Sequence, residues 1–302
     1  MIAKKQAVRE TGAGSMRHCR AIGAEYLTFL GGEPTLHPDL PAMVAYASDL
    51  GYTQITIDTN GLAPSRIRRI PSDLLHYVSV SLDGATSSSH DRVRGEGRFV
   101  QTVSAIREFV GAGYPVRINC TVFSFNLGEA EYLLDLAESL GVKLVNFHSF
   151  SEEGLGTGKV DWSLKPQEWI EFYKSLRRMR RERKIGIWFP PTWSRPEDLP
   201  SFVEQGFSGC LGCSLDRLSI FPDGRAYVCS VLFDHPLNFA WMTDGGLELN
   251  RGQNEFDLFM HASFSAVDPV DSGCPAEALL EGANSSERTG LVSMCRCWKE
   301  QV

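Results

Sequence analysis

The sequence predicts an α/β fold, a partial TIM-like (β/α)6 barrel over residues 1–195, followed by a small cysteine-rich domain with a β-hairpin over residues 196–302. From Tyr26 to about Trp193, short β-rich runs alternate with amphipathic helical stretches, which is typical of parallel βα units. Several of these runs are apolar on one face and polar on the other, whereas strands of a flat, fully covered parallel sheet are apolar on both faces. The βα rhythm stops near residue 195, where Pro- and Gly-containing loops and scattered cysteines begin.

The polar faces of the strands indicate where a ligand would bind. Alternation points one set of side chains away from the helices, namely those of Thr56, Asp58, Ser79, Ser81, Asp83, Asn119 and Thr121. A barrel whose outer strand faces meet helices and whose inner faces line a polar cavity explains this pattern. Strands are predicted at 26–30, 53–59, 77–83, 116–122, 144–150 and 185–189. A first strand preceding these six positions is predicted to be missing from the chain, and ligand is expected at the strands' carboxyl ends.

Composition narrows the function class. The 302 residues are 43% hydrophobic and 22% charged, as in soluble globular proteins. A formal net charge of -7 argues against broad electrostatic binding of nucleic acid, and the basic run at 177–181 is interpreted as a solvated helix face. The sequence contains neither an 18-residue apolar stretch nor an N-terminal signal, so no membrane association is expected and the predicted compartment is the cytoplasm. Clustered cysteines in that reducing compartment indicate metal or redox sites rather than disulfides.

Four motifs at the predicted strand ends carry the chemistry. They are GGEP at 31–34, DTNGL at 58–62, SVSLDG at 79–84 and HDRVRGEGRF at 90–99. In the first, the glycines let backbone approach a ligand closely, and a carboxylate beyond a strand end can accept hydrogen bonds from a ligand ammonium group. In this order the four motifs resemble the radical S-adenosylmethionine (radical SAM) superfamily, in the branch with SPASM or Twitch C-terminal domains, over roughly residues 25–300.

The resemblance implies a set of cofactor-binding residues. Gly31, Gly32 and Glu33 would hold the amino group of S-adenosylmethionine, and polar residues at the following strand ends would face its ribose and carboxylate. The implied positions are Gly31, Gly32, Glu33, Pro34, Asp58, Asn60, Ser81, Asp83, Asn119 and Thr121. Thr56 and Ser79 are interpreted as hydrogen-bonded residues of the barrel interior. His148, on the polar face of strand 144–150, is either a substrate contact or a structural histidine.

The implied activity is that of a radical SAM oxidoreductase or modifying enzyme. With S-adenosylmethionine and [4Fe–4S] clusters, such an enzyme generates a 5′-deoxyadenosyl radical that abstracts hydrogen from a peptide or small-molecule substrate. A reductant protein such as flavodoxin or ferredoxin is the expected partner. The sequence selects neither a substrate nor a catalytic residue.

The chain departs from the family pattern at its start. Radical SAM enzymes use a CxxxCxxC loop after the first strand, and this chain has none. Cys19 is the sole cysteine before GGEP, and it lies in a helical stretch that fits the first barrel helix, so it is interpreted as a packing residue. A strand and cluster loop upstream of Met1 would restore the pattern. The alternative is a degenerate chain that serves as a non-catalytic iron–sulfur or zinc protein for binding or electron transfer.

The C-terminal cysteines predict a metal centre. Cys210 and Cys213 form a CxxC, and a hairpin turning at 222–224 brings Cys229 close behind it. Soft thiolates suit zinc or iron–sulfur clusters, and spacing alone does not separate the two. The resemblance favours at least one auxiliary [4Fe–4S] cluster, with candidate ligands Cys210, Cys213, Cys229, Cys274, Cys295 and Cys297. Cys120, on the apolar side of its strand, is interpreted as a core residue.

Overall fold

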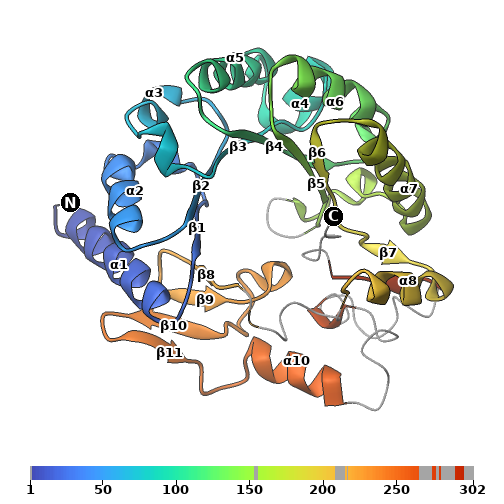
Figure 1. Cartoon of the computed structure of the whole chain (residues 1–302). Coiled ribbons are helices and arrows are strands. Elements are labelled where there is room, and N and C mark those ends of the chain that lie inside the picture. The colour runs from blue at the N-terminus through green and yellow to red at the C-terminus, as the bar shows by residue number, and fades with distance from the viewer. Residues whose placement is uncertain are drawn as a thin grey trace.

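The computed structural model describes residues 2–152, 156–207, 215, 217–264, 274–276, 279 and 290–295. Its main feature is a six-stranded parallel sheet in the order β1-β2-β3-β4-β5-β6, which Figure 1 shows as an arc. The strands are β1 (Tyr26–Phe29), β2 (Gln54–Thr59), β3 (Tyr77–Ser81), β4 (Val116–Val122), β5 (Leu144–Ser149) and β6 (Gly186–Trp188). The predicted partial barrel and its six strands are confirmed.

Helices cover the outer side of the arc (Figure 1). They are α1 (Ile2–Ala21), α2 (Leu40–Asp49), α3 (Pro64–Ile67), α4 (Ser87–Arg94), α5 (Arg98–Gly111), α6 (Ala130–Ser139) and α7 (Pro166–Glu182), with short 3-10 turns η1 (Pro34–Leu36), η2 (Ser72–Leu74), η3 (Leu127–Glu129) and η5 (Val160–Trp162). Val78 and Val80 of β3 are fully buried in one apolar cluster with Ile106 and Phe109 of α5. The apolar strand faces therefore meet the helices, and this contact buries the main core. None of the described helices combines the length and apolarity needed to cross a membrane.

The parallel register places the polar side chains in rows on the inner face. Asp58 pairs in register with Ser79, and Ser79 with Arg117. One step nearer the carboxyl ends, Ser81 pairs with Asn119, which is in register with Asn146. The two-residue alternation seen in the sequence thus becomes a polar lining that crosses several strands.

A small antiparallel sheet lies across the open side of the arc, beside β1 and α1 (Figure 1). Its strands are β8 (Ser219–Ile220), β9 (Arg225–Tyr227), β10 (Ala240–Thr243) and β11 (Gly246–Leu249), followed by α10 (Glu255–Phe264), with η7 (Ser230–Leu232) after β9. The β8–β9 hairpin confirms the predicted turn. Gly224 has a positive φ of +89°, and a Cβ there would lie 2.8 Å from the Met242 carbonyl oxygen, so the turn requires glycine.

Short elements join the end of the chain to the barrel. β7 (Trp193–Ser194) pairs antiparallel with β12 (Val292–Ser293), and η6 (Pro196–Asp198) and α8 (Leu199–Glu204) follow β7. Phe202 and Met294 belong to the same buried cluster as the barrel core. The core of the barrel therefore includes side chains from beyond residue 195.

Candidate functional site

The turn after β1 presents backbone groups at the carboxyl edge of the sheet. Gly31 and Gly32 are exposed and have φ values of +86° and +53°. An added Cβ would meet nothing within 4 Å at either position, so conformation rather than space requires glycine. Within the described part of the chain, no hydrogen bond engages the backbone of either glycine. These N–H and C=O groups are free to bind a ligand.

The Glu33 carboxylate fixes this turn. One oxygen, Oε1, accepts hydrogen bonds from the Thr35 backbone N–H at 3.1 Å, from the Thr35 hydroxyl at 2.5 Å and from the Thr59 hydroxyl at 2.7 Å. The other oxygen, Oε2, accepts one from the Asn60 backbone N–H at 2.7 Å. Glu33 therefore ties the end of β1 and the first residues of η1 to the end of β2. Its side chain is engaged with the protein, and Pro34 begins η1 directly behind it.

Polar side chains at the ends of β3, β4 and β5 lie beside one another. The Asn146 amide nitrogen is 3.1 Å from Asn119 Oδ1 and 2.6 Å from His148 Nε2. These contacts form a row of polar side chains across β4 and β5. The hydroxyls of Ser81 and Thr121 are half-buried and make no hydrogen bond within the described residues. The inner face thus presents amide side chains that hold one another by hydrogen bonds. It also presents two hydroxyls that can still hydrogen-bond to a ligand.

Arg117 is an inner-face residue that sequence reasoning missed. Its Nε donates to Ser79 Oγ at 2.9 Å, and a terminal nitrogen lies 3.5 Å from Asp58 Oδ1. The guanidinium also lies 5.2 Å from the centre of the Tyr77 ring. Burial lowers the pKa of Arg117, although the neighbouring Asp58 charge opposes that shift. The same alternation that marks Asn119 and Thr121 could have marked Arg117.

Asp83 acts as a brace, because its buried carboxylate joins the end of β3 to β4 and α4. Its side chain is fully buried, with Oδ2 2.6 Å from Arg94 Nε and Oδ1 accepting the Thr121 backbone N–H at 2.8 Å. The Asp83 backbone N–H donates to His90 Nδ1 at 3.1 Å, and its carbonyl accepts from Asn126 at 2.9 Å. His90 and Arg94, four residues apart on α4, therefore both contact Asp83. These contacts join the third motif to the fourth.

His90 should make stability depend on pH. Its Nε2 is buried without a hydrogen-bond partner in the described part of the chain, and burial lowers the pKa of the imidazole. Below about pH 6.5 the unfolded chain then binds more protons than the folded one. The contribution of His90 to the free energy of unfolding is therefore full above that pH and is lost as the pH falls. Urea unfolding at pH 7.5 and 5.5 should show a smaller acid-induced loss for His90→Gln than for the wild type. Equal losses would contradict this assignment.

The candidate metal ligands are distributed over two apolar clusters. Cys229 and Cys274 are buried in one cluster with Phe259 of α10. Cys295 packs into the barrel cluster instead. Cys210, Cys213 and Cys297 lie outside the described residues. Among the residues that are described, no three His, Cys, Asp or Glu side chains converge on one point, so the ligand set stays a prediction.

Two further cysteines lie away from this region. Cys120 on β4 is buried, and burial raises the pKa of its thiol well above the usual value. Cys19 on α1 is half-buried, and burial raises the pKa of its thiol as well. Both thiols are disfavoured as thiolates, in keeping with their interpretation as packing residues.

A buried acid next to Cys229 was not predicted. Glu255, the first residue of α10, is fully buried and accepts backbone N–H groups from Val228 at 2.7 Å and Cys229 at 3.1 Å. Burial raises the pKa of its carboxyl to about 7, against the opposing effect of these hydrogen bonds. Nothing in the local sequence distinguishes Glu255 from an exposed first-turn glutamate.

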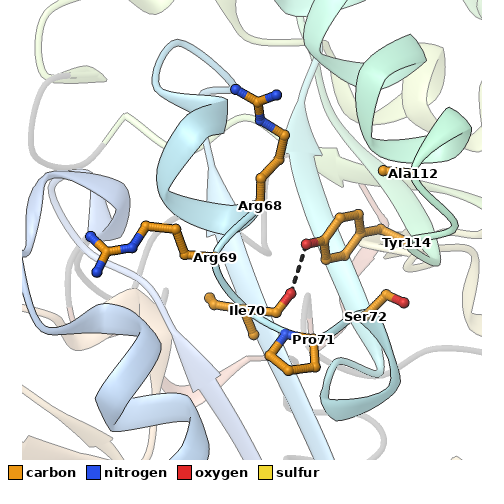
Figure 2. Close-up of a pocket in the computed structure, with 7 residues that line it drawn as sticks. All are labelled: Arg68, Arg69, Ile70, Pro71, Ser72, Ala112 and Tyr114. Atoms are coloured by element: carbon orange, nitrogen blue, oxygen red, sulfur yellow. Dashed lines mark hydrogen bonds between the residues drawn. The ribbon is translucent and has the colours of Figure 1, made fainter.

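A surface pocket lies at the amino-terminal ends of the strands of the six-stranded sheet. It has a volume of about 470 Å³ and is lined by Arg68, Arg69, Ile70, Pro71, Ser72, Ala112 and Tyr114, just before β3 and β4 begin. Figure 2 shows both arginine side chains directed away from Tyr114, whose hydroxyl is 2.7 Å from the Ile70 carbonyl oxygen. Ligands of parallel βα folds bind at the carboxyl ends of strands, so this pocket is not the candidate site.

Known proteins resemble the chain in sequence and fold. An AdoMet-dependent heme synthase from Methanosarcina barkeri is 32% identical over 170 residues, covering 55% of this chain and 48% of the relative. A PqqA peptide cyclase from Ruegeria pomeroyi is 30% identical over 226 residues, covering 73% and 58%. The chain thus spans roughly half the length of these curated relatives.

A solved structure and a family profile agree with them. Streptococcus suis SuiB bound to S-adenosylmethionine superposes with a TM-score of 0.60 at 15% identity, covering 82% of this chain and 57% of SuiB. At that identity the match speaks for the fold. Residues 15–137, which contain the Gly31-Gly32 turn and the Asp83 brace, match the Radical SAM superfamily. Residues 15–137 therefore form a radical SAM domain.

Proposed function

We propose that this chain is the greater part of a radical SAM enzyme that binds S-adenosylmethionine at the carboxyl ends of β1 to β4. The observation that carries the proposal is the exposed Gly31-Gly32 backbone, which Glu33 holds in place. Backbone carbonyls suit the ligand's ammonium group, and the unused hydroxyls of Ser81 and Thr121 suit its carboxylate and ribose. Asn119 and Asp58 line the same face. Asn60 holds the Glu33 carboxylate, Pro34 follows Glu33 at the start of η1, and Asp83 holds the Thr121 backbone.

When bound beside a reduced iron–sulfur cluster, S-adenosylmethionine supplies a radical that abstracts hydrogen from a substrate. The chain's own part is to bind and orient the ligand and to keep the inner face polar. We propose a peptide or a small molecule as substrate, because the relatives named above include a peptide cyclase and a heme synthase. A reductant protein of the flavodoxin or ferredoxin type would supply the electron.

The outer edge of β1 supports a further strand before it. β1 ends the sheet on one side and pairs with β2 alone among the described strands. The other edge of β1 therefore presents backbone N–H and C=O groups that no strand of the described residues pairs with. An unpaired strand edge of this kind is suited to pairing with another strand. We therefore propose that a preceding strand, with the CxxxCxxC loop after it, completes the barrel.

Residues 196–302 are proposed to form an auxiliary cluster domain of the SPASM or Twitch type. The support is the shared burial of Cys229 and Cys274 beside the β8–β11 sheet. Thiolates are the ligands that iron–sulfur clusters use, and zinc is the competing metal. The remaining ligands of a four-thiolate site would come from Cys210, Cys213 and Cys297, while Cys295 is a candidate that packs into the barrel cluster instead.

The test compares two proteins, the chain alone and the chain extended by whatever in-frame segment its gene encodes upstream. Both are purified anaerobically and reconstituted with iron and sulfide. Iron and zinc content are measured, together with 5′-deoxyadenosine release from S-adenosylmethionine under a strong reductant. Cleavage by the extended form alone is the expected result.

Other outcomes separate the alternatives. Iron without cleavage in either protein would favour a non-catalytic cluster protein and overturn the proposed activity. Zinc without iron would overturn the auxiliary cluster. A gene with a stop codon directly upstream would remove the proposed preceding strand.

A further inference from the structure

The loop that carries Cys229 is fastened at both ends. At its far end, Arg225 reaches Asp234 at 2.7 Å, and the Tyr227 hydroxyl donates to the His235 carbonyl at 2.8 Å. At its near end, the Glu255 carboxylate holds the backbone N–H groups of Val228 and Cys229. These contacts hold the backbone of Cys229 without a contribution from a metal.

The near-end contact comes from Glu255, an acidic residue in the protein interior. Glu255 is fully buried, and no Lys or Arg pairs with it in the part of the chain that is described. Its own backbone N–H donates to the Leu237 carbonyl at 2.9 Å, so the residue joins α10 to two loop segments. Burying an unpaired carboxylate costs several kcal/mol, roughly, unless hydrogen bonds to it compensate. An apolar residue would pack there at lower cost but would not hold two adjacent N–H groups.

The same helix face reaches the second cysteine of the cluster. Phe259 lies one turn after Glu255 and is fully buried among Cys229, Cys274 and Ala276. Residues four apart on a helix share a face. α10 therefore contacts Cys229 through Glu255 and shares the buried cluster of both cysteines through Phe259.

We infer that Glu255 is a positioning residue for Cys229, holding its backbone so that the thiolate is directed toward the auxiliary metal site. The inference rests on the proposed function, which makes Cys229 a ligand. Residues that orient metal ligands without touching the metal typically change metal affinity about 10–100-fold when replaced.

The test uses the full chain with Glu255→Gln, Glu255→Ala and Cys229→Ala, and with Glu248→Gln as the matched control. Glu248 is an exposed carboxylate on β11 that accepts from Thr243 at 2.9 Å. Gln keeps the size of Glu255 but turns one acceptor into a donor facing an N–H group. Each protein is reconstituted anaerobically, its affinity for iron and its cluster EPR spectrum are recorded, and amide exchange at Val228 and Cys229 is measured without metal.

We expect Glu255→Gln to weaken iron binding by about tenfold, to change the EPR line shape and to speed exchange at the two amides, at a temperature where circular dichroism shows the variant to be folded. Glu248→Gln should match the wild type in every readout. Unchanged iron affinity and EPR in Glu255→Gln, with Cys229→Ala losing iron, would overturn the inference and leave the cluster assignment intact. Full iron in Cys229→Ala would overturn the ligand assignment itself. If Glu255→Ala does not fold, Glu255→Gln decides.

Discussion

Asp83→Ala should lower the free energy of unfolding by about 1–3 kcal/mol, as expected when a buried N–H group loses its hydrogen-bond acceptor. Asp83 is fully buried, and it satisfies both Arg94 and the Thr121 backbone N–H. Without the carboxylate, the buried Thr121 N–H would have no hydrogen-bond acceptor and Arg94 would lose its ion-pair partner. Urea unfolding followed by circular dichroism would give the change.

Asp135→Ala is the matched control for this result. Asp135 also pairs with an arginine, Arg183, at 2.7 Å, but its side chain is 60% exposed. Exposed pairs contribute about 0–1 kcal/mol, so the control should remain close to the wild type. Equal losses for the two variants would show that Asp83 is not the brace that its burial indicates.

Most of the barrel could be predicted because its signals are local. β-branched and apolar residues alternate with polar ones along β4, and each strand is followed by an amphipathic helix, so position and order follow from spacing alone. β10 and β11 were missed, although Asp244-Gly245 between them is a recognised hairpin signal. The pairing of β7 with β12 joins segments far apart in sequence and carries no local signal.

The candidate site was predictable in position but less so in detail. Alternation places Ser81, Asn119 and Thr121 on the inner face correctly, because side-chain direction in a strand is set by residue parity. Alternation cannot show what a side chain is bonded to. Glu33 and Asp83 are engaged by groups from other elements, Asn60 and Arg94, and those contacts exist only in the folded chain.

Glu33→Gln should separate stability from ligand binding at the Gly31-Gly32 turn. An amide nitrogen would face either the Asn60 N–H or the donors at Oε1, so we expect a loss of about 1–3 kcal/mol in unfolding free energy. The turn would also be less ordered before binding, and the ligand would have to supply that ordering. The dissociation constant for S-adenosylmethionine should rise by about tenfold, which corresponds to about 1.4 kcal/mol.

The two effects are measured separately, by urea unfolding of the chain and by calorimetric titration of the extended, cluster-loaded protein with S-adenosylmethionine. Glu25→Gln is the control, since Glu25 is an exposed acid just before β1, and both quantities should stay unchanged. The variant could be less stable and still bind S-adenosylmethionine as tightly as the wild type. That result would show that Glu33 only joins β1 and β2. Weaker binding at temperatures where the variant is fully folded would mean that the carboxylate, without touching the ligand, pre-organises the backbone that does.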